Sequence, residues 1–348
     1  MKKVTALGLF SGGLDSILAC RVIASQSISV IALKFITPFF DDHLRESDEQ
    51  YRETVQRKYG IDVRTVELGA GYMEMIRDPK HGYGKYFNPC VDCKIYMLSR
   101  AREIMDEYNA SFLFTGEVLG QRPMSQRRDT LRVIERDSGC GDILLRPLCA
   151  KRLPETLPER EGLVDREQLY GFTGRGRKQQ IKLADAFGIT DYPNPAGGCI
   201  LTDPNLGTRI EKFYKGGFTL DNRDFLVSDI RLLLVGRQFN LPHGAWFVLG
   251  RNEEENAKIE QLAGEGDWLL KMTDRPGPTG LLRGAAKSIA GTPAEAEIIS
   301  LAAGLIARYA RKIDGKSMPG DVSIEKGAGV LTVRGKLIED NLFRDWLM

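Results

Sequence analysis

The residues best suited to chemistry near the start of the chain are Ser11–Ser16, which read Ser-Gly-Gly-Leu-Asp-Ser. They follow an apolar stretch that predicts a buried strand and precede one with helical spacing. Two glycines let the backbone approach a ligand closely. The first N–H groups of a helix favour an anion. The turn therefore predicts a phosphate-binding site, with main-chain and hydroxyl donors from Ser11, Gly12, Gly13 and Ser16.

Asp15 places a carboxylate in the same anion-binding turn. A carboxylate repels phosphate unless a divalent cation lies between them, and magnesium commonly bridges the two. We therefore predict that the turn holds the pyrophosphate part of ATP, with Mg²⁺ bound at Asp15. The lysine and the glycine spacing of a Walker A loop are absent. The alternative without a ligand is a helix that is simply capped after a glycine turn.

Three cysteines form the second candidate site. Cys90 and Cys93 stand as a C-x2-C pair just before a predicted helix, and Cys199 lies in another glycine-rich turn. Three thiolates can hold a [4Fe–4S] cluster and leave one iron open. Three alternatives remain: a zinc site completed by Cys140 or Cys149, a catalytic disulfide between Cys93 and Cys199, and a structural role for all three.

Apolar segments alternate with helical patterns through the first two hundred residues. This order predicts an α/β fold with a doubly wound parallel sheet. Ligands bind such a sheet at the carboxyl ends of its strands, so the motifs that follow the strands should converge. The expected strands are 4–10, 29–36, 62–68, 111–117 and 143–148, and the expected helices include 41–60 and 93–109.

From about residue 216 the pattern changes to a second, α+β domain. We therefore divide the chain into 1–215 and 216–348. In the second part the apolar patterns predict strands at 229–236, 245–250, 268–272 and 321–335, and a long helix at 293–311.

The 348 residues carry a net charge of only +2, so nucleic-acid binding would need a local patch. Residues 171–182 provide one, and a solvated loop is the alternative there. No apolar run approaches the roughly 18 residues of a membrane span, so we expect a cytoplasmic protein without a membrane partner. The basic side chains of the patch are Arg175, Arg177, Lys178 and Lys182.

Ser-Gly-Gly-Leu-Asp-Ser resembles the PP-loop motif of the ATP pyrophosphatases. The segments TGEVLGQRPMSQ at 115–126 and LLRPL at 144–148 resemble the core of ThiI-type tRNA 4-thiouridine synthetases. The segment PCVDCK at 89–94 is similar to that of the iron–sulfur-dependent members and of 2-thiouridine synthases. Together the resemblance covers about residues 4–213.

This resemblance implies an ATP-dependent tRNA sulfurtransferase that adenylates a uridine carbonyl oxygen and replaces it with sulfur, most simply giving 4-thiouridine. A 2-thiouridine synthase, a PP-loop amidotransferase or ligase for a small molecule, and a non-catalytic RNA-binding protein are the alternatives. The implied catalytic residues are Asp15, Cys90, Cys93 and Cys199, the three cysteines also holding the cluster. The implied ATP-binding residues are Ser11, Gly12, Gly13, Asp15, Ser16, Phe35 (after the second strand, near the adenine), Gly116 and Gln121.

The C-terminal part resembles the NFACT-R RNA-binding domain. The resemblance lies in a turn with Gly250, Arg251, Asn252 and Asn256, followed by Asp267-Trp268. It implies tRNA as a partner, and a solvated helix-capping turn is the alternative. No cysteine follows Cys199, which favours inorganic sulfide or a separate carrier as the sulfur donor. We also consider a homodimer.

Overall fold

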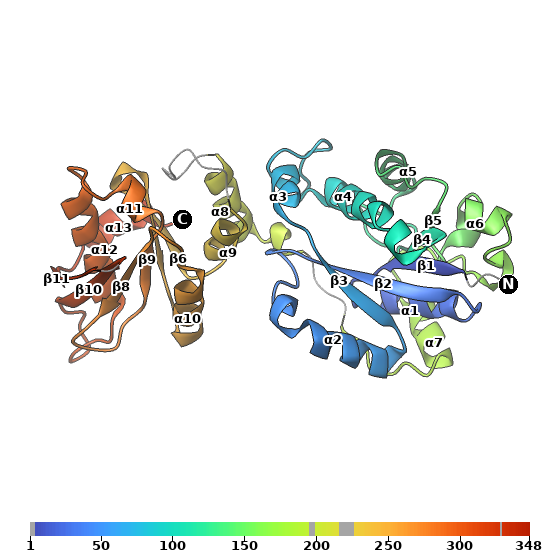
Figure 1. Cartoon of the computed structure of the whole chain (residues 1–348), viewed down its shortest axis with the longest axis horizontal. Helices are drawn as coiled ribbons and strands as arrows, with labels where there is room; N and C mark the ends of the chain where they lie inside the picture. The colour runs from blue at the N-terminus through green and yellow to red at the C-terminus, as the bar shows by residue number, and fades with distance from the viewer. Residues whose placement is uncertain (1–3, 195–198, 216–225, 328) are drawn as a thin grey trace. The chain divides into compact units, whose positions relative to one another are not determined.

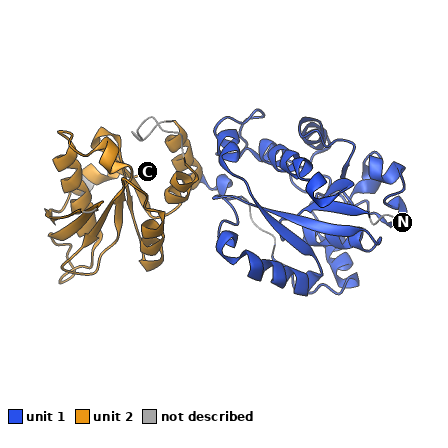
Figure 2. Ribbon diagram, in the orientation of Figure 1, with its two compact units in different colours: residues 1–204 blue, residues 205–348 orange. Residues whose placement is uncertain are grey.

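The computed structural model describes residues 4–194, 199–215, 226–327 and 329–348. The chain divides into two units, residues 1–204 and 205–348 (Figure 2). The predicted domain boundary, between 215 and 216, falls at the edge of segment 216–225, which lies outside the described residues, and it stays a prediction.

A five-stranded sheet forms the centre of the first unit, with every described strand pair parallel. The spatial order β3-β2-β1-β4-β5 confirms the predicted doubly wound sheet. Its strands are β1 (Thr5–Leu9), β2 (Ser29–Ile36), β3 (Asp62–Glu67), β4 (Phe112–Thr115) and β5 (Leu144–Leu145).

Helices cover both faces of this sheet. Helices α1 (Leu14–Ala24) and α7 (Lys178–Ala186) lie on one face, and α4 (Cys90–Glu103) and α5 (Arg128–Asp137) lie on the other (Figure 1). Helix α1 buries eight of its eleven residues, as its apolar sequence predicts. The remaining helices of this unit are α2 (Leu44–Tyr59), α3 (Ala70–Arg77) and α6 (Leu157–Arg160).

The centre of the sheet depends on close packing between β1 and β4. Gly8 of β1 faces Phe114 of β4, and a Cβ at Gly8 would overlap the Phe114 ring. β1 also pairs with β2 on its other side, so the chain order reverses between β1 and β4. Segments that follow strands meet at such a reversal. The turn after Leu9 and the loop after Thr115 therefore start side by side.

The second unit is built on a six-stranded antiparallel sheet of order β11-β10-β8-β9-β7-β6, with α12 (Glu295–Tyr309) packed against it. This confirms the predicted second α+β domain. The strands are β6 (Arg237–Leu241), β7 (Ala245–Leu249), β8 (Trp268–Met272), β9 (Gly280–Leu282), β10 (Gly320–Lys326) and β11 (Gly329–Gly335). The other helices are α8 (Pro204–Tyr214), α9 (Val227–Leu233), α10 (Glu253–Leu262), α11 (Ala285–Ser288) and α13 (Asp340–Trp346).

The predicted strand at 229–236 is wrong, because most of this segment is helix α9. A short leucine-rich run fits a buried strand or a buried helix equally well by periodicity. Asp229 lies in the first turn of α9, where its Oδ2 accepts a hydrogen bond from the Leu226 N–H at 2.9 Å. This cap satisfies an N–H group at the helix start and favours the helix.

No helix among the residues placed by the structure combines the length and apolar character needed to cross a bilayer.

A buried charge cluster holds the second unit together. The guanidinium of Arg283, which is 5% exposed, donates to Asp229 Oδ1 at 2.7 Å and to Asp267 Oδ2 at 2.6 Å. It also donates to the Ser228 hydroxyl at 2.8 Å. Asp267 Oδ1 accepts from the Gly284 N–H at 2.6 Å. The aspartate of the Asp267-Trp268 motif thus has a structural role here.

Replacing Arg283 with alanine should strongly destabilise this unit, because it leaves Asp229 and Asp267 buried without their counter-ion. Breaking a buried pair from one side costs about 3–5 kcal/mol. Urea denaturation measures the loss. The control is Arg334→Ala, which breaks the exposed pair with Asp321 and should cost about 1 kcal/mol or less. Equal losses in both variants would contradict the structural role of Arg283.

Candidate active site

The turn at Ser11–Ser16 connects β1 to α1 and has the shape of an anion cradle. Gly12 has a φ of +83°, in the left-handed region that favours glycine. The Ser11 and Ser16 hydroxyl oxygens lie 3.2 Å apart, and Ser16 donates to the Gly13 carbonyl at 2.8 Å. The Ser16 N–H donates to the Gly13 carbonyl at 3.0 Å, whereas the N–H groups of Leu14 and Asp15 stand at the start of α1, where a helix leaves donors for a ligand.

Lys34 supports this turn from β2, although the sequence pattern did not single it out. Its side chain is buried, and its Nζ donates to the Ser11 carbonyl at 2.9 Å and pairs with Asp41 at 2.6 Å. A single lysine within the apolar strand Ser29–Ile36 was the sequence signal that could have identified it. Buried lysines need such partners.

Asp15 is contacted by Gly116 and Gln121 of the loop after β4. Its Oδ2 accepts from Gln121 Nε2 at 2.7 Å, whereas its Oδ1 is buried without a hydrogen-bond partner among the described residues. A Cβ at Gly116 would lie 2.5 Å from the Asp15 carbonyl oxygen. The structure thus brings Gly116 and Gln121 against Asp15. A buried carboxylate oxygen with an unused lone pair is suited to a cation.

Phe35 differs in position from its prediction. It lies within β2 rather than after it, opposite Val66 of β3, and is 5% exposed. The predicted position after the strand is wrong, because the expected strand 29–36 matches β2 and already contains Phe35, which is buried in the core. Its contact with adenine stays a prediction.

A buried ion-pair cluster lies directly after Gly116. Glu117 accepts from Lys94 Nζ at 2.6 Å and from Arg146 Nε at 3.0 Å, and Arg146 also pairs with Glu135. Burial opposes ionisation of Glu117, but the charges and hydrogen bonds of Lys94 and Arg146 outweigh it and lower the pKa of its carboxyl to about 2. Lys94, Glu117 and Arg146 stand inside the motifs identified above, yet their mutual contacts were not predicted.

The three predicted cysteines are electrostatic neighbours. Cys90 and Cys93 lie in the first turn of α4, and Cys199 follows segment 195–198, which is outside the described residues. Burial raises the pKa of Cys93 to about 12; a Tyr72 hydrogen bond opposes this, and the charges of Cys199 and Cys90 add to it. The Tyr72 hydroxyl lies 3.1 Å from Cys93 Sγ. Tyr72 is fully buried and was missed from the sequence.

The other thiols have different surroundings. Cys140 Sγ donates to main-chain carbonyls of Leu98 and Ser138, and Cys149 Sγ donates to the Glu117 carbonyl. All six cysteines are free thiols in the structure. Within residues 4–194, 199–215, 226–327 and 329–348, no three His, Cys, Asp or Glu side chains surround a common metal position.

The four basic residues of the predicted RNA-contact loop at 171–182 differ in their exposure to solvent. Arg175, Lys178 and Lys182 are exposed, whereas Arg177 is half-buried, with Nη2 3.6 Å from Asp15 Oδ2. Three of the four basic side chains therefore face solvent, whereas Arg177 lies beside Asp15 of the Ser11–Ser16 turn.

The turn at Gly250–Asn256 caps α10. The Asn252 side chain accepts from the Glu255 N–H at 2.9 Å, Arg251 pairs with Glu255, and Asn256 Oδ1 accepts from the Thr279 N–H at 3.0 Å. The side chains of Arg251, Asn252 and Asn256 thus each have a local partner. Its contact with RNA stays a prediction.

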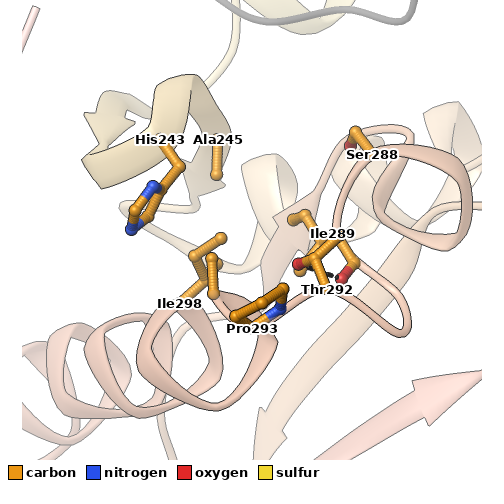
Figure 3. Close-up of a pocket in the computed structure, with 8 residues that line it drawn as sticks. His243, Ala245, Ser288, Ile289, Thr292, Pro293 and Ile298 are labelled. Carbon is orange, nitrogen blue, oxygen red and sulfur yellow. Dashed lines mark hydrogen bonds between the residues drawn. The ribbon is translucent and has the colours of Figure 1, made fainter.

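A pocket of about 400 Å³ lies in the second unit, and its lining is mainly apolar (Figure 3). His243 lines it and has a left-handed φ of +61°. Its Nε2 lies 3.1 Å from Glu297 Oε2. None of the predicted site residues lines this pocket.

Replacing Glu117 with glutamine should remove an acid-sensitive part of the stability. The folded-state pKa of about 2 lies below the ordinary 4.5. The contribution is thus complete above pH 4.5 and is lost as the pH falls toward 2. At pH 7 the variant should lose about 3–5 kcal/mol of unfolding free energy. Its difference from the wild type should narrow between pH 4.5 and 2.

Urea denaturation across this pH range makes the measurement. Glu103→Gln is the matched control, because Glu103 forms an exposed pair with Arg100. It should differ little from the wild type at any pH. A Glu117→Gln difference that stays constant down to pH 2 would argue against a depressed pKa.

Two separate parts of the chain match known families. Residues 2–152 match the family ThiI, described as thiamine biosynthesis protein (ThiI). Residues 236–346 match NFACT-R_2, described as NFACT protein RNA binding domain. The comparison with curated proteins found no match.

Three solved structures are similar over part of the chain. One is a predicted subunit of a tRNA methyltransferase from Methanocaldococcus jannaschii, with 17% identity and a TM-score of 0.33, covering 52% of this chain and 76% of that one. Another is a 4-thiouridine synthetase in complex with RNA and bound ATP, with 20% identity and a TM-score of 0.38, covering 61% of this chain and 50% of that one.

The third is the U34-tRNA thiolase NcsA from Methanococcus maripaludis with its [4Fe-4S] cluster, with 17% identity and a TM-score of 0.33, covering 61% of this chain and 67% of that one. TM-scores this low carry no argument about the present chain. The chain spans half the length of the 4-thiouridine synthetase. The family matches are limited to two parts of the chain: residues 2–152 match the ThiI family, and residues 236–346 match the NFACT-R_2 family of RNA-binding domains.

Proposed function

We propose that the protein is an ATP-dependent tRNA sulfurtransferase that converts a uridine carbonyl to a thiocarbonyl, with 4-thiouridine as the product. The observation that carries this proposal is the ThiI match of residues 2–152, the segment that contains the Ser11–Ser16 turn and the Cys90/Cys93 pair. Residues 1–215 would form the catalytic domain. Residues 216–348 would bind tRNA, as the NFACT-R_2 match supports.

The turn and Asp15 would bind ATP with magnesium. Ser11, Gly12, Gly13 and Ser16 would donate hydrogen bonds to the phosphates, and the unpartnered Asp15 Oδ1 is the atom suited to Mg²⁺. Gln121 holds the other carboxylate oxygen and so orients Asp15. Gly116 leaves room for the Asp15 backbone beside the loop after β4.

The reaction balances as two displacements. The uridine carbonyl oxygen attacks the α-phosphorus of ATP, the bond from that phosphorus to the bridging oxygen breaks, and pyrophosphate leaves with the electron pair. A sulfide sulfur then attacks the ring carbon, and AMP leaves with the former carbonyl oxygen. Inorganic sulfide or a separate carrier protein would supply the sulfur, and the working unit would be a homodimer in the cytoplasm.

Cys90, Cys93 and Cys199 would hold a [4Fe–4S] cluster. The chemistry of the donors supports this, because thiolates are the ligands that such clusters take and the three cysteines come from two segments of the first unit. When bound, such a cluster supplies an iron that can take a sulfur ligand. The Tyr72 hydroxyl would orient Cys93 through the 3.1 Å hydrogen bond. Metal-bound thiolates are usually held by such neighbours.

Replacing Asp15 with alanine should reduce tRNA-dependent formation of AMP and pyrophosphate by at least about 100-fold, because the site loses a group that stabilises developing charge. The assay uses tRNA from a deletion strain, and circular dichroism checks the fold. The control is Asp129→Ala, which removes an exposed ion pair with Arg127 and should keep wild-type turnover.

Two results would contradict the proposal. An Asp15→Ala protein with wild-type AMP formation would remove Asp15 from the site. AMP formation by the wild type that does not need tRNA would favour an amidotransferase or ligase for a small molecule. Nucleoside analysis of tRNA from the deletion strain then distinguishes 4-thiouridine from 2-thiouridine.

Protein purified without oxygen should be brown, with about four irons per chain. Cys90→Ala, Cys93→Ala and Cys199→Ala should each lose colour, iron and thiolation. Cys140→Ala and Cys149→Ala are the controls and should keep all three, since these thiols bond to main-chain carbonyls. Full thiolation by colourless, iron-free protein would favour the catalytic disulfide, and bound zinc with retained activity would favour a zinc site.

A further inference from the structure

Arg177 is set apart from the other basic residues of its loop. It immediately precedes α7, its side chain is 23% exposed, and its Nη2 lies 3.6 Å from Asp15 Oδ2. The neighbouring Arg175 and Lys178 are exposed. The guanidinium of Arg177 thus lies at the predicted phosphate turn, although it is far from that turn in sequence.

The loop before α7 is bound to the loop after β4. Gly174 N–H donates to the Leu119 carbonyl at 2.8 Å, and Thr173 forms a β-bridge with Leu119. Gly120 has a φ of +76°, a backbone conformation that glycine adopts readily. These main-chain contacts fix the position from which Arg177 reaches Asp15.

A series of side-chain hydrogen bonds also connects α7 to Asp15. Gln180, in the first turn of α7, is 1% exposed and donates to Gln121 Oε1 at 3.2 Å. Gln121 in turn donates to Asp15 Oδ2 at 2.7 Å. The Oε1 of Gln180 and the Oδ1 of Asp15 are both buried without partners among the described residues. Buried polar atoms without partners indicate a missing polar group.

The geometry points to Arg177 as a ligand of the β- and γ-phosphates of ATP, the part that leaves as pyrophosphate. This inference rests on the proposed function and assigns Arg177 to the nucleotide rather than to RNA. At 3.6 Å its contact with Asp15 is too long for a hydrogen bond. A guanidinium has a planar set of donors that matches phosphate oxygens.

Arg177 would act on the first displacement. When the uridine oxygen attacks the α-phosphorus, the bond to the bridging oxygen breaks and its electron pair moves onto pyrophosphate. The positive charge of Arg177 would stabilise the negative charge that develops there. Arg175 and Lys178, which are exposed, would remain available for RNA phosphates.

Binding of inorganic pyrophosphate and of a non-hydrolysable ATP analogue to the full chain, measured by calorimetry, tests this inference. Arg177→Ala should weaken pyrophosphate binding about 10- to 100-fold, the loss expected for a charge-assisted hydrogen bond. Arg177→Lys should recover part of it. The matched control Arg175→Ala, two residues away, should bind pyrophosphate within about twofold of the wild type.

The same variants are titrated with tRNA at several salt concentrations. Arg175→Ala should make the salt dependence shallower by about 0.7–0.9 log units for each phosphate that the arginine neutralises, whereas Arg177→Ala should leave the slope unchanged. Thermal denaturation confirms that each variant is folded.

The outcomes distinguish the inference about Arg177 from the proposed function. Wild-type pyrophosphate affinity in Arg177→Ala would overturn the inference, and a shallower tRNA salt dependence in that variant would assign Arg177 to RNA instead. A wild-type protein that binds neither pyrophosphate nor the ATP analogue would overturn the proposed function itself.

Discussion

The buried carboxylate of Glu117 connects the two halves of the candidate active site. It pairs with Lys94, which directly follows Cys93 in α4, and with Arg146, which directly follows β5. Glu117 itself directly follows Gly116, the residue packed against the Asp15 backbone. One carboxylate therefore links helix α4, which carries Cys90 and Cys93, to the loop after β4 and to the residue after the edge strand β5. A shift of any of these elements would separate buried opposite charges, which is costly.

This arrangement gives a reason for the polar cluster of Glu117, Lys94 and Arg146 in the first unit. An apolar side chain in place of Glu117 would avoid the cost of burying that carboxylate, but it would leave the buried Arg146 without one of its two counter-ions, which is costly. It would not orient Lys94 and Arg146, whose positive charges lie beside a site proposed to bind a nucleotide. The directional contacts of charged groups define one arrangement of the loops, whereas apolar packing tolerates several.

The second unit has its own charged centre in Arg283, and this changes the interpretation of its motif. Asp267 belongs to the segment that resembles RNA-binding domains, yet both of its oxygens bond within the unit. Asn252 also bonds within the unit, because its side chain caps helix α10. These motif residues thus maintain the shape of the domain.

Local patterns in the sequence were sufficient for the architecture. Alternating apolar segments predicted the parallel sheet, because a buried strand and the helix that crosses over it each leave a local pattern. The Ser11–Ser16 turn and the Cys90/Cys93 pair were also visible, since each lies within six residues. The leucine run at 229–236 was misassigned, because periodicity does not separate a short buried helix from a strand. The expected strand 29–36 agrees with β2, and Phe35, which was placed after that strand, lies inside it.

Only the tertiary structure decided which distant side chains meet. Arg177 lies 162 residues after Asp15, and Lys94 lies 52 residues before Arg146. Tyr72 contacts Cys93 from a different helix. No local pattern records such contacts, because a polar residue in a loop or helix has the same sequence context whether it faces water or a buried partner. The sequence by itself thus determined the sheet, the turn and the cysteine pair, and folding decided which charges and hydroxyls surround them.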